Sequence, residues 1–129
     1  LCIEAGVGII PYSPLARGVL AGNRSDGGIG ETERAKYDKG LLTGASLFRD
    51  SDKQVVTNVI AVAEKYNIKP TQVALSWILN KSAVVSPIIG ATKLSHISDA
   101  VSSIDIELSG EDIKKLESAY QPRVAEPNI

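Results

Sequence analysis

Residues 83–102 read AVVSPIIGATKLSHISDAVS, and the pattern of apolar and small residues in them indicates the fold class. The apolar, β-rich run Ala83–Gly90 predicts a fully buried strand. A turn of small residues follows it, and Leu94–Ser102 predicts a helix because its apolar residues recur at helical spacing. Pro87 cannot donate to a central ladder, so the strand requires a bulge or an unbonded position there. A strand, a short turn and a helix in succession are typical of a β/α unit.

A second unit of this kind lies earlier in the chain. Val7–Tyr12, with the sequence VGIIPY, predicts another buried strand, and the loop SPLARGVLAGN follows it. Strands that alternate with helices run parallel and are joined by helical crossovers. Two parallel strands that are apolar on both faces need further strands beside them. We therefore expect an α/β fold in which this chain forms part of a larger sheet or barrel.

Three further helices are indicated by their start signals. The helix expected over 51–67 opens with the capping pattern S-x-x-Q, and the helix over 70–80 has proline at its first position. The helix over 109–120 opens with S-x-x-D. Glu64–Lys65 and Glu111–Asp112 are expected on exposed helix faces, with Asp112 also capping. The apolar residues expected to face the core are Val55, Val59, Val62, Tyr66, Val73, Ala74, Trp77, Ile78, Ile113 and Leu116.

The composition excludes several classes of protein. The 129 residues are 43% hydrophobic and 22% charged, with a formal net charge of -1, which is ordinary for a soluble globular segment. Basic residues are spread along the chain, so we expect neither a nucleic-acid nor a membrane partner. The single cysteine, Cys2, excludes an internal disulfide and favours a reducing, cytoplasmic location. The longest apolar runs are too short to span a bilayer.

Two segments have little periodic structure. Arg24–Arg49 is rich in glycine and charge and predicts a long loop, over about residues 24–50, that can form a lid on a bound cofactor or substrate. The tail from Gln121 onward contains two prolines and is expected to lie along the surface. The chain begins with Leu1 instead of Met, and Leu1–Ala5 reads like the end of a helix. We therefore expect that an N-terminal part of the fold is missing from this sequence.

The loops after the two predicted strands suit phosphate. Tyr12–Gly18 and Gly90–Lys93 contain small residues that let the backbone approach an anion, and a helix N-terminus supplies N–H donors and a favourable dipole. Arg17 and Lys93 can neutralise negative charge. In (β/α)8 barrels the loops after strands seven and eight commonly bind phosphate. The order of elements in this chain matches those positions.

Four strings of this sequence resemble, in order, C-terminal segments of the aldo-keto reductase family. IIPYSPLARGVLAG (9–22) is similar to the seventh strand and its loop, and TQVALSWIL (71–79) to the seventh helix. PIIGATKLSHISDAV (87–101) is similar to the eighth strand, the cofactor loop and its helix, and SGEDIKKLE (109–117) to the closing helix. The resemblance implies that residues 1–129 form the C-terminal part of a (β/α)8 TIM barrel, two parallel strands with flanking helices. It is weakest in the predicted long loop.

The resemblance also implies part of an NADPH site. Tyr12 matches the aromatic residue that stacks on the nicotinamide ring. The residues that match the pyrophosphate loop are Ser13, Leu15, Arg17 and Gly18. Those that match the loop around the adenosine phosphate are Gly90, Ala91, Thr92 and Lys93, while His96 and Asp99 match contacts to the adenine or its ribose. Ala100 stands where many relatives have asparagine, so part of the adenine contact stays open. Lys93 is the best candidate for a 2′-phosphate partner, and NADPH is favoured over NADH by family habit more than by residues.

Each of these residues has a simpler interpretation. Tyr12 could cap a strand, and Arg17 and Lys93 could be solvated surface cations. His96, the one histidine, could be an ordinary polar residue of a helix. The flanking residues and the second loop favour the cofactor roles.

The family's proton-transfer residues, a tyrosine, a lysine, an aspartate and a histidine, have no counterpart in this segment. We therefore assign no catalytic residue here, and no metal-ligand spacing is present. The resemblance implies an oxidoreductase that reduces small aldehydes or ketones by hydride transfer from NADPH, with this segment inactive alone. Two alternatives stay open, a non-catalytic barrel that binds the cofactor and an inactive truncated product.

Overall fold

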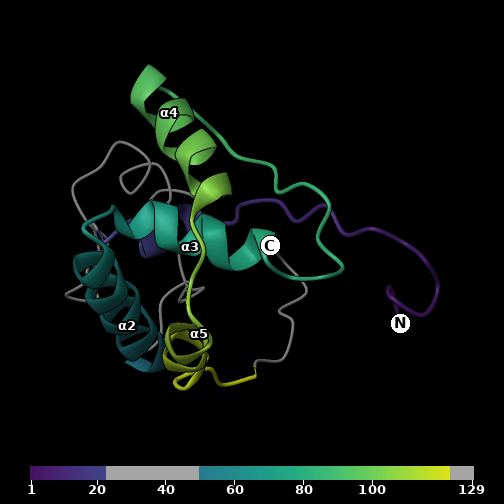
Figure 1. Ribbon diagram of the computed structural model, residues 1–129, viewed down its shortest axis with the longest axis horizontal. Helices are drawn as coiled ribbons and strands as arrows, with labels where there is room; N and C mark the ends of the chain where they lie inside the picture. The colour runs from purple at the N-terminus through teal and green to yellow at the C-terminus, as the bar shows by residue number, and fades with distance from the viewer. Residues whose placement is uncertain (23–49, 123–129) are drawn as a thin grey trace, which may run out of the picture.

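The computed structural model describes residues 1–22 and 50–122 of the chain (Figure 1). The predicted loop over about 24–50, with its possible lid, and most of the expected C-terminal tail fall outside these residues. The described helices are η1 (Ala16–Ala21), α2 (Asp50–Tyr66), α3 (Pro70–Leu79), α4 (Leu94–Ser102), η2 (Ser103–Asp105) and α5 (Gly110–Glu117), where η marks a 3-10 helix.

The hydrophobic core lies among α2, α3 and α5. Figure 1 shows α3 crossing the middle of the molecule, with α4 on one side and α2 and α5 on the other. The buried core residues are Val59, Val62 and Ala63 of α2, Val73 of α3 and Leu116 of α5, and Leu20, Tyr66, Ile68, Trp77 and Leu108 pack against them. The apolar stripes predicted for these helices therefore face one another. On α2, Val56 is also buried, whereas the predicted Val55 is only half-buried.

The helix boundaries confirm most of the local signals in the sequence. Pro70 is the first residue of α3, and Asn67, with a φ of 53°, follows the last residue of α2. Ser109 caps α5, because its side chain accepts the backbone N–H of Asp112 at 3.2 Å. Helix α2 includes Asp50, and the Gln54 side-chain amide donates to Asn58 Oδ1 at 3.0 Å. The side chain of Ser51 lies outside what the structure describes, so the capping box predicted there stays a prediction.

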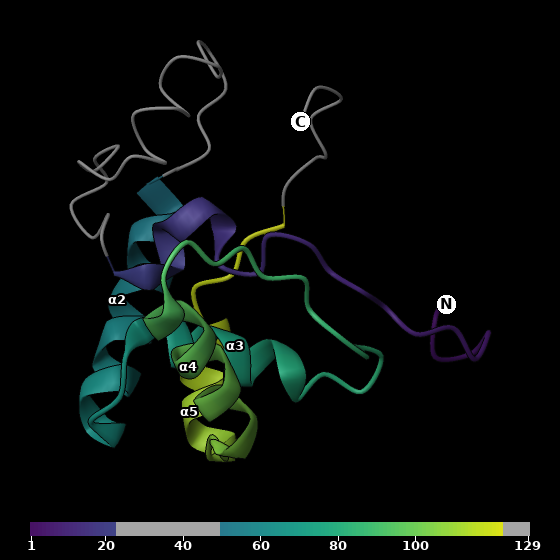
Figure 2. The same ribbon diagram turned by 90° about the horizontal axis from the view of Figure 1, so that it is seen from above.

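The two predicted strands are present only as isolated parallel bridges. Ile9 pairs with Val84, and Tyr12 pairs with Ile88. The two segments run side by side in both views (Figures 1 and 2). Among residues 1–22 and 50–122 no continuous strand forms, which corrects the expectation of strands over 7–12 and 83–90.

Two prolines explain why the pairing is interrupted. The Ile9 N–H donates to the Ala83 carbonyl at 2.7 Å, and the Val85 N–H donates back to the Ile9 carbonyl at 3.0 Å. A regular parallel ladder would next use the N–H groups of residues 11 and 87, and both are prolines. The ladder resumes at Ile88, whose N–H donates to the Pro11 carbonyl at 2.8 Å. One segment therefore advances by one residue more than the other, as at a β-bulge.

The predicted burial of these segments is also wrong for the described residues. The side chains of Val7, Ile10, Val85 and Ile88 are all more than half exposed. Helix α4 has the predicted bounds. The apolar residues of its predicted stripe, Leu94, Ile97 and Val101, are exposed as well. Within the described part of the chain, no element covers these apolar faces. Each of the two segments is hydrogen-bonded only to the other.

Candidate cofactor-binding site

The first predicted site loop has an unusual backbone. Ser13, Ala16, Arg17 and Gly18 all have positive φ angles, at 53°, 48°, 55° and 90°. Backbone hydrogen bonds hold the turn: the Ala16 N–H donates to Ser13 and the Gly18 N–H donates to Leu15, both at 2.9 Å. Left-handed conformations cost energy for residues other than glycine and gather at functional sites.

The second predicted site loop runs directly into helix α4. Lys93 has an extended backbone and lies at the cap position, and the first turn of α4 contains no acidic residue. Helix N-termini favour anions through their unpaired N–H groups and their dipole. Gly90 has open space around it, because a Cβ atom added there would meet nothing within 4 Å. The turn and the helix end are therefore open to a close approach by a negatively charged group.

The two loops leave the paired segments at the same end. Tyr12 lies opposite Ile88 in a parallel bridge, and Gly90 follows two residues after Ile88. Tyr12 is 68% exposed, so its ring is largely accessible. Of the predicted residues, the structure thus brings together the end of Val7–Tyr12 and the turn that starts at Gly90.

His96 and Asp99, one helical turn apart, have different surroundings. The Thr92 N–H donates to Nδ1 of His96 at 3.4 Å, a long hydrogen bond in an exposed position. Asp99 turns toward α3, where both of its carboxylate oxygens accept hydrogen bonds from Lys69 Nζ at 2.8 Å. Asp99 therefore already has a protein partner, which the sequence analysis did not foresee.

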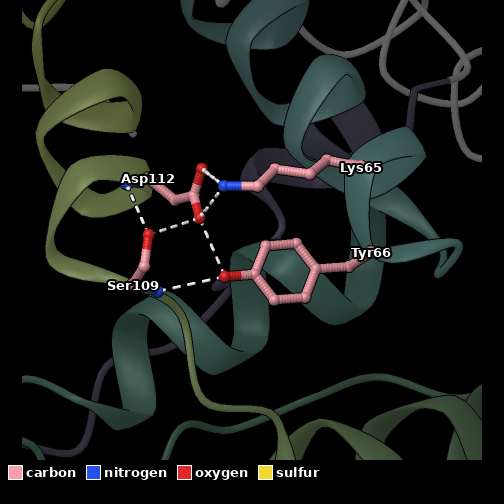
Figure 3. Close-up of polar contacts among 4 residues, drawn as sticks. All are labelled: Lys65, Tyr66, Ser109 and Asp112. Atoms are coloured by element: carbon pink, nitrogen blue, oxygen red, sulfur yellow. Dashed lines mark hydrogen bonds and ion pairs between the residues drawn. The ribbon is translucent and has the colours of Figure 1, made fainter.

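A cluster of charged and polar side chains lies away from these loops, between α2 and α5 (Figure 3). Asp112 accepts hydrogen bonds from Lys65 Nζ at 2.9 and 2.8 Å, from the Tyr66 hydroxyl at 2.8 Å and from the Ser109 hydroxyl at 2.6 Å. The hydrogen bond from Lys65, followed by those from Ser109 and Tyr66, lowers the pKa of Asp112 to about 2. The same hydrogen bond raises the pKa of Lys65.

This cluster is structural, although tyrosine, lysine and aspartate also make up a proton-transfer set. The Tyr66 hydroxyl donates to Asp112 and accepts the Ser109 backbone N–H at 3.1 Å, so both of its functions are used. The expectation that Glu111–Asp112 lies exposed is wrong for Asp112, which is 3% exposed. Its partners on α2 lie 46 and 47 residues away in the chain, and no local pattern could have indicated them.

A second polar cluster ties α3 to α5. Trp77 Nε1 donates to a Glu117 carboxylate oxygen at 3.0 Å, and Lys81 forms an ion pair with the same oxygen. Lys81 also lies 4.4 Å from the centroid of the Trp77 ring. The hydrogen bonds from Lys81 and Trp77 lower the pKa of Glu117. Across the described ranges no set of histidine, cysteine and acidic side chains suits a metal ion, and no helix is long and apolar enough to cross a membrane.

A family model and several curated relatives point to the same protein family. The model of the aldo/keto reductase family matches residues 1–121. A Schizosaccharomyces pombe protein named among the aryl-alcohol dehydrogenases is 41% identical over 121 residues, which cover 94% of this chain and 33% of that protein. The versiconal hemiacetal acetate reductase of Aspergillus parasiticus is 35% identical over 130 residues, with 98% of this chain and 36% of the enzyme covered. A Glycine max protein named as an aldo-keto reductase is 31% identical over 119 residues, covering 90% of this chain and 33% of that protein.

The chain spans about a third of the length of the curated relatives that it matches. Members of this family are oxidoreductases built on a (β/α)8 barrel, and they generally use a nicotinamide cofactor. The match of the family model over 121 of the 129 residues decides the assignment. This chain belongs to the aldo/keto reductase family.

Proposed function

We propose that this chain supplies part of the cofactor site of an NADPH-dependent reductase of aldehydes or ketones. The observation that carries the proposal is the parallel bridge between Tyr12 and Ile88. It sets the strained loop after Tyr12 and the turn at Gly90 at one end of the paired segments. A dinucleotide has two phosphate-bearing halves and can lie across two such loops at once.

The residues of the two loops fit the parts of such a cofactor. Tyr12 would form one wall for the nicotinamide ring, and the loop residues Ser13, Leu15, Arg17 and Gly18 would surround the pyrophosphate. Gly90, Ala91, Thr92 and Lys93 would hold the adenosine phosphate at the start of α4, with His96 and Asp99 beside the adenine or ribose. Lys93 at the cap of α4 supports a preference for NADPH, because its ammonium group can pair with a 2′-phosphate. When bound, NADPH supplies the hydride.

The chain's own contribution to the reaction is positioning. A fixed aromatic ring and two anchored phosphate groups would hold the nicotinamide in one orientation toward the carbonyl carbon. The proton for the carbonyl oxygen would come from residues outside this segment. On this account residues 1–129 form the C-terminal part of the barrel, with 7–12 and 83–90 completed as strands by neighbours on both edges. The single cysteine, Cys2, supports a cytoplasmic location.

The experiment that tests the proposal compares two glycine substitutions in the full-length protein. An added Cβ meets nothing within 4 Å at either Gly90 or Gly110, and neither residue has a positive φ, so both substitutions leave the fold intact. Gly90→Ala should raise the Kd for NADPH about tenfold, roughly the loss of one hydrogen bond to a charged group. Gly110→Ala, at the start of α5, is the matched control and should leave the Kd unchanged.

Fluorescence titration with NADPH provides the measurement. Equal affinities of the wild type and the Gly90→Ala variant would contradict the proposed site, and absence of NADPH binding by the wild type would contradict the proposed function. Binding without reduction of any simple aldehyde would favour the non-catalytic alternative.

A further inference from the structure

Lys69 and Asp99 join two elements that lie 30 residues apart in the chain. Both Asp99 oxygens lie 2.8 Å from Lys69 Nζ, and the Asp99 side chain is only 21% exposed. We propose that Lys69 acts on the cofactor through Asp99: it neutralises this carboxylate, so that the site accepts a 2′-phosphate. This inference rests on the proposed function and identifies a residue outside both loops that would set cofactor preference.

Lys69 precedes a helix that has a buried face, whereas α4 has no buried residue. Lys69 immediately precedes α3, and its backbone N–H donates to the Gln72 side chain at 3.0 Å. Helix α3 contains four buried residues in succession, Val73 to Ser76, whereas α4 has none. An ion pair from the start of α3 to the middle of α4 therefore connects a helix with a buried face to the one that would bind the adenosine phosphate.

The charge of Asp99 matters because it lies near the anion-binding end of α4. Asp99 is five residues after Leu94, the first residue of the helix, which is roughly 8 Å along the helix axis. This distance is comparable with the screening length of about 8 Å at physiological salt. An uncompensated carboxylate there would repel a 2′-phosphate and would suit the 2′-hydroxyl of NADH instead, since an acidic residue near the ribose is a mark of NAD-binding sites. Lys69 cancels that charge.

The test uses Lys69→Gln, Asp99→Asn and the double variant in the full-length protein, with Kd measured for NADPH and for NADH at low salt. Lys69→Gln should weaken NADPH about fivefold, which is the effect of one unit charge on a doubly charged phosphate at about 8 Å in water. NADH lacks that phosphate and keeps only the singly charged adenosine phosphate at the start of α4, so its affinity should fall by no more than about twofold. In the Lys69→Gln protein, Asp99→Asn should recover most of the lost NADPH affinity, because the asparagine amide carries no charge and keeps an acceptor oxygen beside the adenine or ribose. High salt should reduce the fivefold effect. Lys114→Gln, which removes an exposed lysine of α5, is the control and should change neither Kd.

Several outcomes would overturn the inference. An unchanged NADPH affinity in Lys69→Gln would do so. An equal loss for both cofactors, or a loss that Asp99→Asn does not restore, would reduce the pair to a structural tie between α3 and α4. Absence of NADPH binding by the wild type would instead overturn the proposed function on which the inference rests, so the two failures are distinguishable.

Discussion

Among single residues, Asp112 shows how far packing can alter an expected environment: it was expected on an exposed helix face, and its carboxylate is buried between two helices. Sequence alone indicated its capping position, because Ser109 and Asp112 are three residues apart. Its partners Lys65 and Tyr66 come from another helix, so its burial depends on packing that no local pattern contains. Asp99 is a similar case, since its pairing with Lys69 spans 30 residues.

The first prediction concerns acid stability. The folded state lowers the pKa of Asp112 from 3.8 to about 2, so its ionised form stabilises the fold above about pH 4. This contribution should be lost as the pH falls from about 4 to about 2, because Asp112 is protonated in the unfolded state before it is protonated in the folded state. Urea unfolding of the full-length protein at a series of pH values between 7 and 2 provides the measurement.

Two variants separate this carboxylate from the others. Asp112→Asn should be less stable than the wild type at pH 7 and should lose less stability between pH 4 and pH 2. Glu111→Gln, which changes the exposed neighbour, should keep the wild-type profile. An Asp112→Asn protein with the full acid-induced loss of stability would show that other groups cause it.

Among the secondary-structure elements, the bounds of the helices could be predicted from the sequence, whereas for the strands only the parallel pairing could. Proline, capping serine and apolar spacing are local signals, and they placed α3 and α4 to within about one residue, an accuracy rarely available at helix ends. A strand needs a hydrogen-bonded neighbour that lies far away in the sequence, and among the described residues each of the two segments pairs only with the other. The prolines at positions 11 and 87 then leave isolated bridges where a ladder was predicted.

The second prediction tests how closely the two paired segments approach. A Cβ atom added at Gly8 would lie 2.2 Å from Val85 Cγ2, closer than real contacts permit. Gly8→Ala should therefore lower the free energy of unfolding by about 1–3 kcal/mol, the usual cost of overpacking. Val85→Ala in the same chain removes the obstructing methyl group and should restore most of that loss. A Gly8→Ala protein as stable as the wild type in urea unfolding would show that the segments are not in contact at this point.

At the scale of the whole molecule, the exposed apolar faces of the paired segments and of α4 have no cover within the described residues. The family barrel closes by pairing each strand on both edges, and this chain spans about a third of its relatives. Composition and periodicity predicted that a larger sheet is needed. They could not predict which faces stay exposed, because that depends on residues beyond this segment.

The third prediction follows from those faces. The 129-residue polypeptide, expressed alone, should self-associate through its unpaired edges and should not reduce simple aldehydes with NADPH. Analytical ultracentrifugation and an absorbance assay for NADPH consumption check the two halves of this statement. A monodisperse monomer with a sharp cooperative melt, or turnover at an ordinary enzymatic rate, would contradict it.

In the proposed complex, one dinucleotide lies across the loop after Tyr12 and the turn at Gly90. Amide hydrogen exchange of the full-length protein, measured with and without NADPH, reports on both segments in one experiment. We expect slower exchange in the presence of NADPH at residues 13–18 and 90–96 together. Protection confined to one of these segments, or found only elsewhere in the protein, would contradict it.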